Sequence, residues 1–135
     1  RKKWGIDKNE KLIGLIARID PIKGHPTFLE AAKLIKSKFP NIRFVCVGRG
    51  EAEYENTMRR LATKMGLDDV LIWVGECSNM VEVYNALDIA SCSSYGEGFP
   101  NMIGEAMSCR VPCQVTDVGD SVLIVALWVS PGSLK

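Results

Sequence analysis

Residues 42–75 read IRFVCVGRGEAEYENTMRRLATKMGLDDVLIWVG and contain two apolar runs separated by an amphipathic segment. The runs, residues 42–48 and 70–75, are short, rich in β-branched residues and closed by glycine, as buried strands are. Between them, apolar residues recur at helical spacing over residues 58–65, and Gly66 follows as the expected C-cap. Because both strands are apolar along their length, this segment predicts two parallel strands that are covered on both faces.

The same alternation continues on both sides of this segment. The expected strands are residues 11–19, 42–48, 70–75, 88–94 and 113–118, and the expected helices are residues 27–39, 58–66, 79–87 and 100–108. Asn79 and Glu82 are spaced as a capping pair, and Pro100 suits a first helical position. Five strands with four intervening helices predict an α/β fold: a three-layer α/β/α arrangement around a mostly parallel sheet.

The composition limits the classes of function. With 135 residues, 47% hydrophobic and 24% charged, the chain fits one globular domain. A net charge of +1 gives no field that would select nucleic acid or an anionic membrane. No stretch approaches the roughly 18–20 apolar residues of a membrane span, and the start of the chain does not resemble a targeting peptide. We therefore expect a cytoplasmic protein without a membrane segment.

The cysteines and the single histidine do not predict a metal site. The chain has five cysteines without a C-x-x-C spacing, no histidine pair and no Asp-x-Asp. We expect reduced thiols, although Cys109 and Cys113 flank a turn and leave a reversible disulfide open. For His25, which lies beside Pro26 at an expected helix start, capping or packing is favoured over proton transfer.

A ligand crevice is expected where the parallel strands end, because loops gather at the carboxyl edge of such a sheet. One segment there, residues 96–106, reads GEGFPNMIGEA and combines glycines with a helix start, which suits a phosphate group. Glu97 and Glu105 lie at two depths of this segment and could accept hydrogen bonds from sugar and ribose hydroxyls. The alternative, that Glu97 caps the helix and Glu105 is a solvated charge, is equally supported by the chemistry alone.

Arg18 and Lys23 follow the first expected strand and are five residues apart. Two cations at the carboxyl end of a buried strand could hold a diphosphate, the arginine through its planar fork and the lysine as a point charge. The alternative is a pair of surface charges over the sheet edge. The apolar run before Arg18 favours the diphosphate site. A further loop, Gly48-Arg49-Gly50-Glu51, resembles part of a dinucleotide fingerprint and is weak evidence alone.

Four motifs in order resemble the C-terminal domain of family 4 retaining glycosyltransferases of the GT-B fold, over residues 4–124. They are Ala17-Arg18-Ile19-Asp20-Pro21-Ile22-Lys23-Gly24, Val47-Gly48-Arg49-Gly50, Val74-Gly75, and Glu97-Gly98-Phe99-Pro100-Asn101 through Glu105-Ala106. The two glutamates have the Glu-x7-Glu spacing of that family. The resemblance implies a Rossmann-like half of an enzyme that transfers a sugar, with retention, from a nucleoside diphosphate donor, with surface polysaccharide or lipopolysaccharide as its usual product.

The resemblance also implies roles for individual residues. Arg18 and Lys23 would hold the donor diphosphate, Glu97 would contact the donor sugar, and Glu105 would bind the ribose hydroxyls. The other expected donor contacts are Gly48, Gly75, Glu76, Cys77, Gly98, Phe99, Asn101 and Met102. No metal or other cofactor is implied. The partner implied is an N-terminal domain of the same parent chain, which carries the acceptor site, so the isolated domain should transfer nothing.

Two departures from the family pattern lie near the end of the chain. Arg110-Val111-Pro112 replaces a common Gly-Val-Pro, which places a bulky cation at a tight turn, and the tail after residue 121 lacks the expected glycine-rich turn and closing helices. We therefore expect a domain truncated at both ends. Two other interpretations stay open: half of a sugar-nucleotide epimerase, and a non-catalytic nucleotide-binding module.

Overall fold

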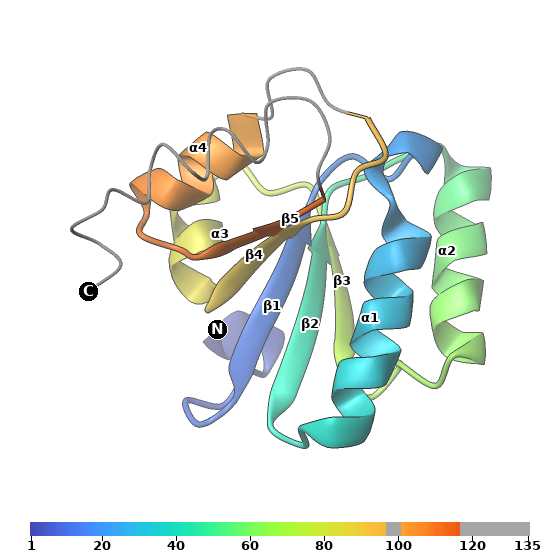
Figure 1. The fold of residues 1–135 in the computed structure, drawn as a ribbon, viewed down its shortest axis with the longest axis horizontal. Helices are drawn as coiled ribbons and strands as arrows, with labels where there is room; N and C mark the ends of the chain where they lie inside the picture. Colours follow the sequence, from blue (N-terminus) through green and yellow to red (C-terminus); the bar gives the residue numbers. More distant parts are fainter. Residues whose placement is uncertain (97–100, 117–135) are drawn as a thin grey trace.

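A five-stranded parallel sheet in the order β3-β2-β1-β4-β5 runs through the centre of the protein (Figure 1). The computed structural model describes residues 1–96 and 101–116. The strands are β1 (Lys11–Ile16), β2 (Ile42–Val47), β3 (Leu71–Gly75), β4 (Ile89–Cys92) and β5 (Cys113–Val115). The α-helices are α1 (His25–Lys38), α2 (Ala52–Lys64), α3 (Met80–Ala86) and α4 (Asn101–Ser108), with short 3₁₀ turns η1 (Lys2–Trp4) and η2 (Pro21–Lys23).

Helices cover both faces of the sheet, as the apolar strands predict. Helices α1 and α2 lie on one face and α3 and α4 on the other (Figure 1). Alternate residues of β2 therefore enter two different cores: Phe44 and Cys46 pack with α1 and α2, whereas Val45 and Val47 pack with α3 and α4. The predicted fold class, a three-layer Rossmann-like α/β arrangement, is confirmed.

Two element boundaries differ most clearly from the expected ones: the start of α2 and the end of β1. Helix α2 begins at Ala52, whereas the apolar pattern starts only at Met58, because the residues of the first turns are mostly charged or polar. Glu53 and Glu55 lie in that first turn, where the positive end of the helix dipole favours carboxylates. The expected strand over residues 11–19 ends at Ile16, and Asn79 caps α3 by accepting a hydrogen bond from the Glu82 amide, as predicted.

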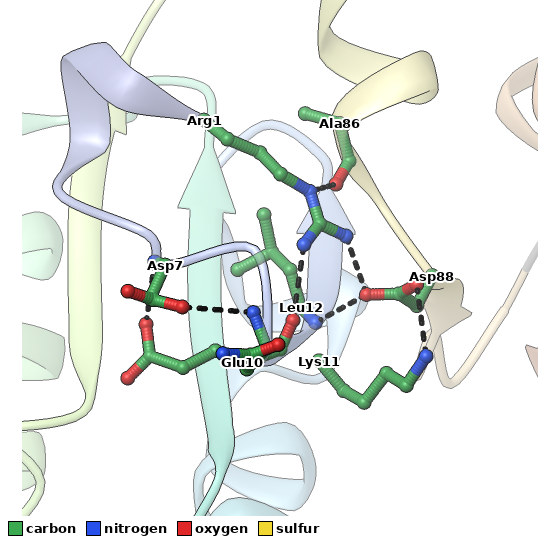
Figure 2. A network of polar contacts seen from close by, with 8 residues as sticks. Arg1, Asp7, Glu10, Lys11, Leu12, Ala86 and Asp88 are labelled. Carbon is green, nitrogen blue, oxygen red and sulfur yellow. Dashed lines mark hydrogen bonds and ion pairs between the residues drawn. The ribbon is translucent and has the colours of Figure 1, made fainter.

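The amino-terminal edge of the sheet is fixed by a network around Arg1 (Figure 2). Its guanidinium donates to the carbonyls of Ala86 and Glu10, at 2.8 and 3.0 Å, and to the Asp88 carboxylate. Asp88 also accepts the amide of Leu12 at 2.8 Å, so one carboxylate joins the starts of β1 and β4. This network lies at the end of the sheet opposite to the one where ligands of such folds bind. It stabilises the fold and is no part of the candidate site.

Arg110 is the one residue other than glycine with a positive φ, 60°, among the described residues. It follows α4, and the amides of Arg110 and Val111 donate to the carbonyls of Met107 and Ala106 to close the helix end. This left-handed position favours glycine, because a Cβ there crowds the backbone. The bulky cation predicted at a tight turn is thus confirmed.

We expect Arg110→Gly to raise the free energy of unfolding by about 1 kcal/mol, because glycine adopts this conformation without the steric cost. Ser108→Gly, within the last turn of α4, is the matched control and should lower it by about 0.5 kcal/mol. Thermal or urea unfolding measures both changes. Equal destabilisation by the two glycines would contradict this explanation of the turn.

Candidate functional site

The order of the strands reverses at β1, and the candidate site lies there. From β1 the chain proceeds outward through β2 to β3, and then returns to the other side of β1 to form β4. The loops that follow β1 and β4 therefore leave the sheet side by side and diverge. In open parallel sheets, the crevice at such a switch point, beyond the carboxyl ends of the strands, is where ligands bind.

These two loops are held together by direct backbone contact. The Ser93 hydroxyl lies 2.9 Å from the carbonyl oxygen of Gly24 and 3.1 Å from that of Lys23, and its single proton is shared between these two acceptors. The Tyr95 amide donates to the Ile22 carbonyl at 2.8 Å. Gly24 has a φ of 72°, and a Cβ there would lie 1.8 Å from the Ser93 carbonyl oxygen. Only glycine allows this approach, so Lys23 and the start of α1 are fixed against the loop after β4.

The loop after β2 is held in the same way on the other side of β1. Gly48 donates to the Gly75 carbonyl at 2.7 Å, which joins two residues predicted to contact the donor. A Cβ on Gly48, whose φ is 137°, would lie 2.0 Å from the Ala17 carbonyl oxygen. Two residues further on, Gly50 forms a parallel bridge with Ile19. The three loops therefore form one braced surface at the carboxyl edge.

Glu55 of α2 supports this loop from below. Its carboxylate accepts the Gly50 amide at 3.3 Å and the Arg59 guanidinium at 2.9 Å. The Arg59 guanidinium, which also lies 5.1 Å from the centre of the Trp73 ring, holds the pKa of Glu55 below its ordinary value. The buried carboxylate therefore stays charged near neutral pH and keeps its hold on the glycine loop.

Arg18 stands on the surface of this edge, with 75% of its side chain exposed. Its Nε and Nη2 atoms lie 3.0 and 2.9 Å from one oxygen of Asp20, and the other oxygen of Asp20 accepts the Ile22 amide. The apolar run before Arg18 suggests a less exposed side chain. The arginine is exposed because β1 ends two residues earlier, at Ile16. A hollow of 360 Å³ adjoins the arginine. It is lined by Arg18, Ile19, Asp20, Pro21, Gly50, Glu51 and Tyr54.

Glu105 is also exposed, but one of its oxygens is fixed. The hydroxyl of Tyr84, a residue of α3 with only 2% exposure, donates to Glu105 Oε2 at 2.7 Å. Burial and this carboxylate raise the pKa of Tyr84, so the phenol remains protonated near neutral pH. A carboxylate so placed can accept further hydrogen bonds from a ligand through its remaining lone pairs.

The other predicted donor contacts fall into two groups. Glu97, Gly98 and Phe99 lie outside the described residues, so their predicted roles remain predictions. Of the rest, Glu76 and Asn101 are exposed. The side chains of Cys77 and Met102, in contrast, pack against the core shared by α3 and α4. Both side chains are only partly buried there.

Sequence reasoning missed the residues that hold the site in place. Ser93 and Tyr84 contact segments that are distant along the chain, and nothing local signals those contacts. Arg49 was read only as part of a glycine loop. A side chain at Gly75 would lie 3.4 Å from its guanidinium. Asp20 appears in the sequence only as part of the first motif, although an Asp before Pro at a turn commonly caps the amide two residues further on, here that of Ile22.

An apolar groove of 260 Å³ lies between α1 and the strands β4 and β5. Its walls are mostly hydrocarbon, from residues such as Ile13, Phe28 and Ile89, so it does not suit a charged ligand. Within residues 1–96 and 101–116, no group of three or more His, Cys, Asp or Glu side chains could hold a metal ion. The five cysteines are free thiols. None of the described helices is long and apolar enough to cross a membrane.

Residues 1–132 match the family described as Glycosyl transferases group 1. The chain belongs to this family. It is similar to D-inositol 3-phosphate glycosyltransferase of Mycolicibacterium smegmatis, with 31% identity over 96% of the chain and 30% of that protein. It also resembles the lipopolysaccharide core biosynthesis mannosyltransferase LpsB of Rhizobium meliloti, with 30% identity over 88% of the chain and 35% of that protein. The chain thus spans about a third of the length of these relatives.

Solved structures share the fold. One is HepE from Anabaena, solved in complex with UDP. The match covers 93% of the present chain and 34% of the HepE chain, with a TM-score of 0.84 and 24% identity. The C-terminal domain of LpcC, a group 1 protein from Francisella tularensis, matches 93% of the chain and 78% of its own, with a TM-score of 0.72 and 24% identity. The architecture is that of the C-terminal domain of GT-B glycosyltransferases.

His25, at the start of α1, is fully buried, and neither of its ring nitrogens has a hydrogen-bond partner among the described residues. Burial lowers the pKa of His25 to about 4, and the nearby Asp20 offsets this only in part. The packing interpretation of this residue is therefore confirmed. The imidazole is neutral in the folded group 1 domain and takes no charge at neutral pH.

Because the unfolded chain binds a proton at His25 near its ordinary pKa of 6.5 and the folded chain only near 4, stability should fall as the pH drops between these values. The slope approaches about 1.4 kcal/mol per pH unit. Urea unfolding at pH 7, 6 and 5 measures it, with His25→Leu as the control, which should flatten this pH range. An equally steep dependence in the leucine variant would show that other groups cause it.

Proposed function

We propose that this chain is the donor-binding domain of a family 4 retaining glycosyltransferase, which transfers a sugar from a nucleoside diphosphate to an acceptor. The observation that carries the proposal is the braced edge at the switch point. It presents the guanidinium of Arg18 and fixes the backbone of Lys23 on one loop, and α4 supplies the exposed carboxylate of Glu105. Cations for a diphosphate together with a carboxylate for ribose hydroxyls match a nucleotide donor.

The chemistry asked of the domain is binding and charge stabilisation. As the sugar leaves, negative charge grows on the diphosphate, and fixed positive charge nearby lowers the barrier. Arg18 supplies part of it: Asp20 engages the Nε–Nη2 edge of the guanidinium and leaves Nη1 for a phosphate oxygen. Lys23 and the amino-terminal end of α4 supply the rest. Glu97 contacts the donor sugar in this proposal.

The names of similar proteins support the substrate class. HepE has been solved with UDP-glucose as well as with UDP, and LpsB is named for lipopolysaccharide core synthesis. We propose the same broad setting, the synthesis of surface polysaccharide or lipopolysaccharide, for the protein to which this chain belongs. The acceptor would bind an N-terminal domain of that protein, and the reaction would take place in the cytoplasm without a metal or other cofactor.

Nucleotide binding is the direct test. We expect UDP, GDP or ADP to raise the thermal midpoint of the 135-residue chain, and NAD to leave it unchanged. At about 100 times the dissociation constant, a ligand adds about 2.7 kcal/mol of stability, which raises the midpoint of a domain of this size by several degrees. Glu105→Ala should abolish most of the shift, because the ribose hydroxyls lose their acceptor.

Two further variants sharpen this test. Arg18→Ala should weaken binding of the diphosphates but leave the binding of the parent nucleoside unchanged, since the nucleoside carries no phosphate. Lys2→Ala, at the opposite edge of the sheet, is the control and should change neither. If none of the three nucleoside diphosphates shifts the midpoint at millimolar concentration, the donor-binding proposal fails for this chain.

A further inference from the structure

We propose that Tyr84 is a positioning residue of the nucleotide site: its buried hydroxyl holds the Glu105 carboxylate in the orientation that accepts the ribose hydroxyls. This inference rests on the proposed function, since it assigns Glu105 to the ribose. It adds a residue from a different helix, α3, to the carboxylate that α4 carries. The experiment below distinguishes a failure of the Tyr84 role from a failure of the proposed function.

The tyrosine is placed to act as a fixed anchor. Its side chain is 2% exposed and belongs to the core that α3 and α4 share with the sheet, together with Val83 and Ala106. A ring packed on all sides cannot change its rotamer without disturbing that core. Its hydroxyl reaches the boundary between the two helices and lies 2.7 Å from Glu105 Oε2. The hydroxyl position is therefore set by the core and not by the surface.

The glutamate alone would not be ordered. Glu105 lies on the exposed side of α4, and a solvated glutamate samples several rotamers. The bond to Tyr84 selects those in which Oε2 faces α3, and Oε1 is then directed away from the tyrosine. Because the rotamer freedom is lost before the ligand arrives, binding does not have to restrict it. Pre-ordering one such side chain corresponds to a gain in affinity of about threefold to tenfold.

The bond is asymmetric, which favours a functional role over a purely structural one. The phenol is buried and has no other hydrogen-bond partner among the described residues, so it needs Glu105. The carboxylate is exposed and could be hydrated by water without Tyr84. A structural need of the core would be met equally well by phenylalanine, which requires no partner. The hydroxyl therefore matters to the carboxylate's orientation and little to the fold.

The test compares ribonucleotides with analogues that lack the hydroxyls that Glu105 would bind. The dissociation constants of UDP, GDP and ADP, and of their 2′,3′-dideoxy forms, are measured by calorimetry for the 135-residue chain and for Tyr84→Phe. We expect the unaltered chain to prefer the ribonucleotide. In Tyr84→Phe the preference should shrink by about threefold to tenfold, through weaker ribonucleotide binding, while the affinity for the dideoxy form stays the same.

Two controls separate positioning from packing. Val83→Ala removes a buried neighbour on the same helix and leaves the hydroxyl in place, so it should lower the thermal midpoint but keep the ribose preference. Tyr84→Met, which lacks the hydroxyl and fills apolar space flexibly, should behave as Tyr84→Phe does. It provides the measurement if the phenylalanine variant does not fold.

Each outcome that contradicts our expectation overturns a different claim. A ribose preference in the unaltered chain that is unchanged in Tyr84→Phe overturns the positioning role and leaves the donor site intact. Equal affinity of the unaltered chain for both forms overturns the assignment of Glu105 to the ribose, and the role of Tyr84 with it. Absence of all nucleotide binding overturns the proposed function itself. A loss of preference in Val83→Ala as large as in Tyr84→Phe would show that general packing is responsible.

Discussion

The contact between Ser93 and the Lys23–Gly24 backbone is the constraint on which the site depends. It joins loops about 70 residues apart, and these lie together only because β1 and β4 are neighbours in the sheet. The chain between them forms β2, β3 and three helices. The two loops come together only where β4 pairs with β1, and that pairing closes the long connection through β2 and β3. The crevice is thus a property of the finished topology.

This dependence explains why glycine and small polar residues gather at the carboxyl edge. Two loops that leave adjacent parallel strands start close together, and their backbones touch before they diverge. At Gly24 and Gly48 the neighbouring carbonyl oxygen occupies the space of a Cβ, so the loops approach more closely than any other residue would allow. At the opposite edge the spacing is filled instead by long side chains, such as Arg1 reaching Ala86 and Asp88.

A structural feature could be predicted from the sequence where the interactions that form it lie within a few residues of one another, and not where they join distant segments. The apolar strands, their parallel arrangement and the Asn79 cap are decided within a few residues, and each was predicted correctly. Helix α2 was predicted too short because its first turns carry no apolar pattern. The helical spacing of residues 79–87 is consistent with a buried Tyr84, but the partner of its hydroxyl lies 21 residues away on another helix. Periodicity predicts that a side chain is buried, and says nothing about which polar group it meets there.

The polar groups of the site share one arrangement, in which an outer group is held by a better fixed one. Arg18 is held by Asp20, which is itself fixed as the cap of the Ile22 amide, and Glu105 is held by the buried Tyr84. The exposed Arg18–Asp20 ion pair adds only about 0–1 kcal/mol to stability, so the fold does not require it. A flexible arginine or glutamate would have to be ordered by the ligand itself, and that cost would be subtracted from the affinity. The inner partners remove the cost in advance, because the core or the backbone has already fixed them. If the carboxyl edge binds the donor as we propose, its polar groups are therefore ordered before that ligand arrives.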